Sequence, residues 1–114
     1  MMGVVMVATV LLYSGRENPG WRIPAGRAAD VVRAMDAMPE IVCPPPTIGG
    51  LGYTGVRLSV KAPESVERIW TFAGSIAMSD QRCFADAGRK VERMVLRTGR
   101  SHIDPAVFAS ILPE

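Results

Sequence analysis

Residues 4–13 have the sequence VVMVATVLLY, and this apolar run sets the plan of the fold. β-Branched residues are frequent in it, and apolar side chains occupy both alternating positions, so it predicts a buried β-strand covered on both faces. The run is shorter than the roughly 18 residues that a membrane-spanning helix needs. It also lacks the basic start and the cleavage site of a secretory leader, so we expect an interior strand of a cytoplasmic protein.

The composition of the 114 residues predicts one globular domain spanning 1–114. Hydrophobic residues make up 48% and charged residues 21%, which excludes a disordered chain. The net charge of +2 is too small to indicate a nucleic-acid or membrane partner by itself. The spacing of Cys43 and Cys83 matches no metal or redox motif, and it leaves open whether they are bridged; we expect free thiols.

A polar, turn-rich loop follows the strand at residues 13–21. Pro19 and Gly20 supply the two central residues of a type II turn. In sheets of the α/β type, ligands commonly bind at a polar loop that follows a buried strand. The guanidinium of Arg16 could pair with a carboxylate or phosphate through two hydrogen bonds. The sequence therefore gives four candidate residues for binding a ligand or partner: Tyr13, Arg16, Asn18 and Trp21.

The same four residues have a structural interpretation, which the sequence leaves open. Arg16 could form a salt bridge with a neighbour, and Asn18 could hydrogen-bond its own backbone as a turn former. Tyr13 and Trp21 could wall the core. The loop is thus a candidate site whose role has to be tested.

The loop also carries a resemblance to other proteins. Residues 13–19 read Tyr-Ser-Gly-Arg-Glu-Asn-Pro, Trp21 follows, and residues 51–55 read Leu-Gly-Tyr-Thr-Gly. This pattern resembles a group of small uncharacterised microbial proteins in which the box reads Tyr-Ser-Gly-Arg-Pro-Asn-Pro. Glu17 departs from that box. The resemblance marks the loop and implies no activity.

Helix signals and strand signals alternate along the rest of the chain. Pro24 suits the first turn of a helix that Pro39 ends. Residues 56–62 alternate apolar and polar side chains, which predicts a strand with one solvent-facing side. Residues 70–78 continue the alternation and predict a long return strand that bends at Gly74. The first helix has its apolar residues at helical spacing: Ala28, Val31, Val32, Met35 and Met38.

Two further helices complete the expected fold. Ser79-Asp80 predicts the cap of a helix that ends at Gly99, which would take a left-handed conformation. Asp104-Pro105 begins a short final helix. The sequence therefore predicts a single α+β domain in the order β-α-β-β-α-α, with a three-stranded, mostly antiparallel sheet and the helices packed on one face.

Reactive side chains are few, and no catalytic residue is assigned. His102 is the only histidine, so no site with several histidines can form within one chain. Cys83 and His102 could act as a nucleophile and its base, but the sequence places them in separate elements, and the only nearby carboxylate, Asp104, is assigned as a helix cap. We predict no metal and no cofactor.

A basic helix face is the second candidate for a partner. Asp86 lies four residues from both Arg82 and Lys90, so we expect ordinary ion pairs on a solvated helix. Without exposed aromatic side chains for base stacking, this disfavours a nucleic-acid partner. The face consists of Arg82, Arg89, Lys90, Arg93 and Arg97.

These observations favour a non-enzymatic interaction or accessory module. The chain is too short to cover both faces of its sheet, so we expect a second copy or another protein to cover the face without helices. Trp70, Phe72, Arg57, Ser59 and Lys61 are the side chains that could form that face. The alternative is a small enzyme or ligand-binding protein that recognises an anionic small molecule through the loop from Tyr13 to Trp21.

Overall fold

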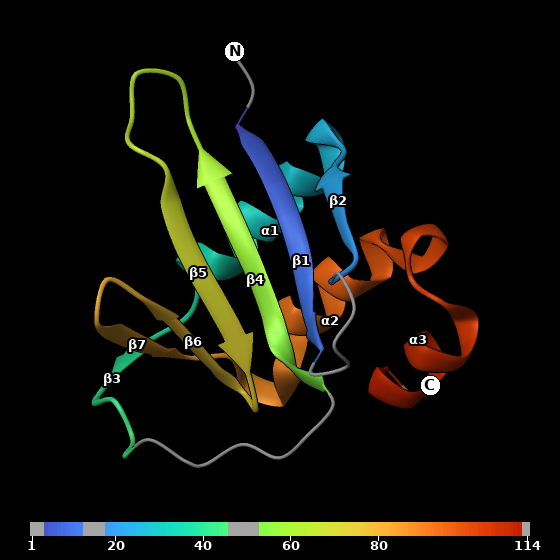
Figure 1. Ribbon diagram of the computed structural model, residues 1–114. Helices are drawn as coiled ribbons and strands as arrows, with labels where there is room; N and C mark the ends of the chain where they lie inside the picture. Colours follow the sequence, from blue (N-terminus) through green and yellow to red (C-terminus); the bar gives the residue numbers. More distant parts are fainter. Residues whose placement is uncertain (1–3, 13–17, 46–52, 113–114) are drawn as a thin grey trace.

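The fold is an α+β domain built on one antiparallel sheet. The computed structural model describes residues 4–12, 18–45 and 53–112. Within these ranges, seven strands form a sheet in the order β2-β1-β4-β5-β6-β7-β3 (Figure 1). The long strands β1 (Val5–Leu12), β4 (Tyr53–Lys61) and β5 (Arg68–Ala73) lie next to one another. The edges are the short strands β2 (Gly20–Ile23) and β3 (Glu40–Ile41). The predicted fold class was right, but the three-stranded sheet is wrong.

A tight hairpin replaces the predicted long return strand. β5 ends at Ala73, which pairs with Ile76 at the start of β6 (Ile76–Ser79). The two residues between them, Gly74 and Ser75, have φ values of 57° and 70°. Two residues at positive φ form the turn that matches the twist of an antiparallel pair. The turn reverses the chain, so the single bending strand of the prediction is wrong.

A second turn of the same kind displaces the predicted helix. Asp80 and Gln81 have φ values of 51° and 65° and join β6 to β7 (Arg82–Ala85). Ser79 pairs with Arg82 across this turn, so it does not cap a helix. Neither central residue is glycine, so no local pattern at these positions indicates a hairpin. The helix α2 (Lys90–Thr98) begins only after a 3₁₀ turn at η1 (Ala87–Arg89).

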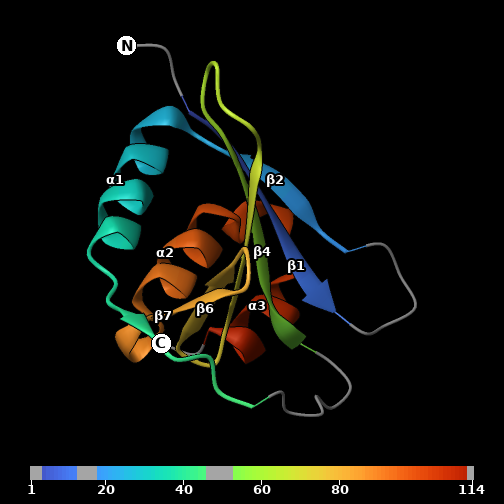
Figure 2. The same ribbon diagram turned by 90° about the vertical axis from the view of Figure 1, so that its left-hand side faces the viewer.

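The helices α1 (Ala25–Asp36) and α2 lie together on one side of the sheet (Figure 2). The first of these begins after Pro24 and ends before Pro39, as predicted. A third helix, α3 (Pro105–Ile111), follows η2 (Arg100–His102), and the Asp104 carboxylate accepts a 2.9 Å hydrogen bond from the Ala106 amide. That cap confirms the predicted start of the last helix.

The core lies between the sheet and α1 and α2. Alternate side chains of β1 point into it, and the register aligns them with alternate residues of β4 and β5. These inward side chains are fully buried: Met6, Ala8, Val10, Val56, Leu58 and Phe72. The other set of side chains on the same strands faces away from α1 and α2, which leaves one face of the sheet open.

Candidate functional site

The predicted loop is only partly described by the structure. Tyr13 and Arg16 lie outside the described residues. Asn18 follows them, and its side-chain oxygen accepts a 3.0 Å hydrogen bond from the Leu12 amide. The Pro19 carbonyl accepts another, at 2.9 Å, from the Val10 amide. Asn18 and Pro19 therefore fasten the far end of the loop to the end of β1.

Trp21 joins β2 to the end of α2. Its indole N–H donates a 2.8 Å hydrogen bond to the Thr98 hydroxyl, and its ring faces that of His102 at a centroid distance of 6.1 Å. A Cβ atom on Gly99 would lie 2.2 Å from the Trp21 ring. Gly99 has a φ of −105°, so the predicted left-handed conformation is wrong. Glycine is required there because the indole occupies the space of a side chain. A binding role for Trp21 and Asn18 stays a prediction.

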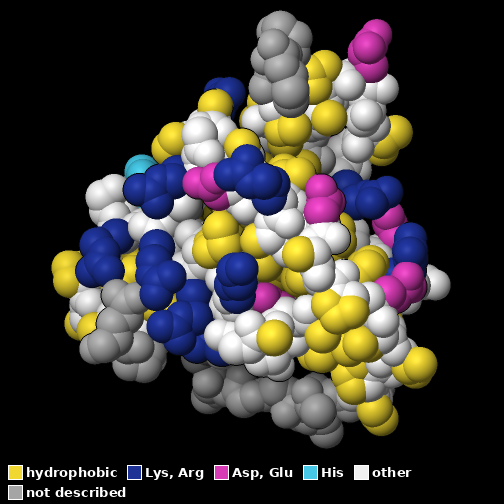
Figure 3. Space-filling view, turned by 180° about the vertical axis from the view of Figure 1, so that it is seen from behind, with side chains coloured by type: hydrophobic (Ala, Val, Ile, Leu, Met, Phe, Trp, Pro, Cys, Tyr) yellow, Lys and Arg dark blue, Asp and Glu magenta, His cyan; other side chains and the backbone are white. Residues whose placement is uncertain are grey.

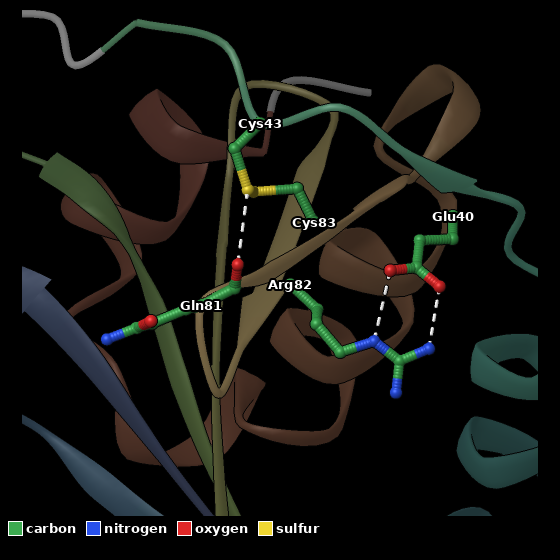
Figure 4. The surroundings of a disulfide bond; sticks show 5 residues. All are labelled: Glu40, Cys43, Gln81, Arg82 and Cys83. Carbon is green, nitrogen blue, oxygen red and sulfur yellow. Dashed lines mark hydrogen bonds and ion pairs between the residues drawn. A yellow bond between two sulfur atoms is a disulfide. The ribbon is translucent and has the colours of Figure 1, made fainter.

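The two cysteines form a disulfide. Cys43 and Cys83 have Cα atoms 5.1 Å apart and are bonded through sulfur, so the expectation of free thiols is wrong (Figure 4). The bond ties the segment that follows β3 to β7, and Cys83 is completely buried beneath it. The Cys43 sulfur also lies 3.6 Å from the Gln81 carbonyl oxygen, a contact without a donated proton because a disulfide sulfur carries none.

The disulfide also excludes the catalytic Cys83–His102 pair that the sequence disfavours. An oxidised sulfur is no nucleophile, and the His102 ring faces Trp21. Beside the disulfide, the Arg82 guanidinium donates hydrogen bonds of 3.0 and 2.6 Å to the two carboxylate oxygens of Glu40. This hydrogen-bonded partner lowers the pKa of the Glu40 carboxyl. Residues 40–43 and 81–83 are therefore held together by a covalent bond and an ion pair.

We call the side of the sheet that faces away from α1 and α2 the open face. Val7, Ser59 and Ile69 form one row across β1, β4 and β5, and Thr9, Arg57 and Thr71 form the next. No described element covers these rows. Large apolar side chains stay exposed on this face by the following fractions: Val5 37%, Val7 40%, Ile69 43% and Met78 47%.

Sequence reasoning found only part of this face. Arg57, Ser59 and Lys61 lie on it as the alternation predicts. Trp70 and Phe72 do not, because their register places them with Leu58 and Val56 towards the core. Ile69 lies one residue before the predicted strand of residues 70–78, and Met78 faces outwards because β6 is a separate strand and not the continuation of β5. Because of the two-residue turn at Gly74 and Ser75, the residues of β6 that face outwards are those that a continuous strand would point towards the core.

The charges near the open face are separated along it. Arg57 and Lys61 of β4, with Arg22 of β2, make the strands basic. The acidic side chains Glu64 and Glu67 belong to the β4–β5 hairpin, whose tip extends beyond the rest of the sheet (Figure 1). Glu67 accepts a hydrogen bond from the Ser59 hydroxyl. The molecule thus presents a basic, partly apolar surface with an acidic projection at one end.

A buried ionic cluster lies at the other end of β4. Glu92 of α2 is 1% exposed, and its carboxylate accepts hydrogen bonds from Arg89 at 3.2 and 2.9 Å and from the Tyr53 hydroxyl. Burial, and then the hydrogen bond to Glu92, raises the pKa of the Tyr53 phenol far above its ordinary value. The Glu92 carboxylate in turn raises the pKa of Arg89. Residues 39 positions apart meet here, so no local pattern could reveal the cluster.

The local backbone is built to place Arg89 in this cluster. Gly88 and Arg89 both have left-handed conformations, with φ values of 63° and 58°. Such a conformation costs an arginine roughly 1–2 kcal/mol. The Arg89 guanidinium compensates by binding Glu92 and by donating a 3.2 Å hydrogen bond to the Ile111 carbonyl at the end of α3. The cluster therefore fastens α3 to the start of α2.

The basic helix face differs from its prediction, because Arg82 lies in β7 and Arg89 in η1, so that only Lys90, Arg93 and Arg97 of the predicted set belong to α2. Asp86 is 2% exposed, and its carboxylate accepts hydrogen bonds of 2.8 and 3.1 Å from the Val91 and Glu92 amides. It therefore caps α2 from inside and does not form the expected ion pairs with Arg82 and Lys90. Seen from behind, Lys and Arg side chains gather on the side that carries α2 and α3 (Figure 3). That nucleic acid is not a partner stays a prediction.

Comparison with known proteins gives no assignment. No family model, no curated protein and no solved structure matches the chain. The resemblance of residues 13–19 to a microbial group therefore stays a prediction. The described ranges contain no cluster of three or more His, Cys, Asp or Glu side chains that could hold a metal. None of the helices in those ranges is long and apolar enough to cross a membrane.

Proposed function

We propose that this protein is a non-enzymatic interaction module that acts through self-association of its open face. The observation that carries the proposal is the set of four large apolar side chains, Val5, Val7, Ile69 and Met78, that no described element covers. Apolar side chains grouped on one face are typical of interaction sites. A second copy of the chain is the occupant we favour.

Charge complementarity supports a second copy. In a twofold dimer each contact occurs twice, with the same two patches exchanged between the copies. If the two open faces pack with a shift, the acidic hairpin of one copy meets the basic strands of the other. Glu64 would then lie near the partner's Arg57, and the aliphatic side chains of both copies would be removed from water. The module would thus bury its exposed apolar surface without placing like charges together.

The proposal is tested by the mass of the particle in solution. Light scattering during size-exclusion chromatography should show a dimer whose fraction rises with protein concentration. Ile69→Glu places a charge in the middle of the interface and should give a monomer. Ala29→Glu makes the same change of charge on exposed α1, and it should remain a dimer. A monomeric wild type at high micromolar concentration would contradict the proposal.

A charge exchange separates this arrangement from other modes of association. Arg57→Glu and Glu64→Lys should each weaken the homodimer, because each brings like charges together across the interface. In a mixed dimer of the two variants, one native Arg57–Glu64 pair remains and the charges of the other pair are exchanged. Both pairs are attractive, so an equimolar mixture should form the mixed dimer. If the mixture stays monomeric, the shifted arrangement is wrong.

The compartment forms part of the proposal. The sequence predicts a cytoplasmic protein, whereas the Cys43–Cys83 disulfide favours an oxidising compartment because cytosolic thiols are kept reduced. Alkylation of the protein in its native cells, followed by mass spectrometry, would decide between them. Blocked cysteines would indicate an oxidising compartment, and fully alkylated cysteines would indicate the cytoplasm.

A further inference from the structure

A pocket of about 500 Å³ opens beside the buried cluster, and Tyr53, Arg89 and Glu92 of that cluster contribute to its lining. Its wall is contributed by the start of β4, the β5–β6 turn, the start of α2 and the end of α3. The pocket is large enough for a small organic molecule. The lining residues are Tyr53, Thr54, Ala73, Gly74, Arg89, Glu92, Ser110 and Ile111.

The polar side chains of this pocket use only part of their hydrogen-bonding capacity within the protein. The Nε and Nη2 groups of Arg89 donate to Glu92 and to the Ile111 carbonyl. These hydrogen bonds do not use the Nη1 group, and the guanidinium, which also interacts with Tyr53, belongs to a side chain that is 30% exposed. Ser110 donates its hydroxyl proton to the Val107 carbonyl at 2.8 Å, which leaves its oxygen able to accept. Arg89 therefore offers the pocket two N–H donors from a guanidinium that is otherwise fixed.

The fixed guanidinium selects an anionic acceptor of low charge. Glu92 holds Arg89 in a single orientation, so little conformational freedom is lost when a ligand accepts from Nη1. The same carboxylate cancels part of the positive charge, which favours a singly charged group over a doubly charged one. Ala73, Ile111 and the Tyr53 ring supply apolar surface for a short organic body.

We propose that this pocket binds a small monocarboxylate, with the Arg89 Nη1 group as the donor to the carboxylate oxygens. Its position supports the assignment, because Leu12, the last residue of β1, pairs with Tyr53. The pocket therefore lies at the end of the sheet where β1 ends and β4 begins. This inference sharpens the alternative function, recognition of an anionic small molecule, and it does not depend on the open face.

The test is an NMR titration of the isotope-labelled protein with benzoate. Saturable shifts are expected for the Gly74 and Ser110 amides at about millimolar concentrations, as suits a ligand with few atoms. Benzamide has the same shape without the charge, and it should bind about tenfold more weakly because a charge-assisted bond is lost. Inorganic phosphate should also bind more weakly. Equal binding of benzamide or phosphate would overturn the assignment.

Two variants and a matched control assign the binding group. Arg89→Lys removes the planar donor edge and should weaken benzoate binding by about tenfold. Ser110→Phe fills the pocket without touching the ion pair, so it provides a test even if Arg89→Lys does not fold. Arg82→Lys alters an arginine bound to Glu40 in the same bidentate manner but outside the pocket, and it should leave binding unchanged. Loss of binding in Arg82→Lys, or none in the other two variants, would refute the proposal.

Discussion

The two faces of the sheet use the same strands in opposite ways. On the face towards α1 and α2, Met6, Leu58 and Phe72 are completely removed from solvent. On the open face, Val7 and Ile69 keep about two-fifths of their surface exposed, 40% and 43%. Alternation along a strand therefore tells which residues share a face. Whether that face is covered depends on how many elements the chain has left to cover it.

The largest expected effect tests this difference in burial directly. Phe72→Ala should lower the free energy of unfolding by about 3–5 kcal/mol, because it leaves a cavity in a close-packed core. Ile69→Ala is the matched control on the open face, and it should lower the free energy of unfolding of the monomer by less than about 1 kcal/mol. Urea denaturation of both variants measures the two values. Similar losses for both would show that the open face is covered within one chain.

A smaller loss is expected when the covalent link on the open face is removed. The double variant Cys43→Ala/Cys83→Ala should be less stable by about 2–4 kcal/mol, since the disulfide restricts the unfolded chain. Denaturation of the wild type with and without a reductant measures the same contribution independently. If neither treatment changes the midpoint, the bond does not stabilise the fold.

The smallest effect concerns Tyr53, which lies in the buried cluster at the start of β4. The pKa of Tyr53 is raised in the folded state above its ordinary 10.0. The protonated Tyr53 phenol therefore stabilises the fold fully below about pH 10. This stabilisation is lost at higher pH, where only the phenol of the unfolded chain ionises. Tyr53→Phe should show a weaker decline of stability between about pH 9 and 11.

The measurement is urea denaturation of wild type and variant at several pH values in that range. Tyr13 is present in both proteins, so its own ionisation affects both equally. Parallel declines in the two proteins would contradict the assigned shift.

Much of this fold follows from local sequence, but its sheet does not. Pro24, Pro39 and Asp104-Pro105 mark α1 and α3 because proline and a capping carboxylate act within a few residues. β2 and β3 have only four and two residues, too few for a periodic pattern. The turn at residues 80–81 has no glycine and no typical hairpin pair, whereas Gly74-Ser75 is a two-residue hairpin signal that the predicted bend did not use. The positions of such short strands depend on pairing with other strands that are distant in the sequence.

The candidate sites show the same limit. The basic row of Arg57, Ser59 and Lys61 is visible as alternation. The ionic cluster of Tyr53, Arg89 and Glu92 is not, because it joins β4 to α2 across the fold. The disulfide likewise depends on β3 pairing with β7, which places Cys43 beside Cys83. Contacts between distant parts of the chain carry no signature in either segment alone.

The shortness of β2 and β3 has a further consequence. Exposed strand edges can recruit strands from other molecules and so lead to fibrils. Here the sheet is bordered by a four-residue strand on one side and a two-residue strand on the other. Each offers too few unpaired amides for an incoming strand to add in register. The protein can therefore keep apolar side chains exposed on its open face with little risk of open-ended polymerisation.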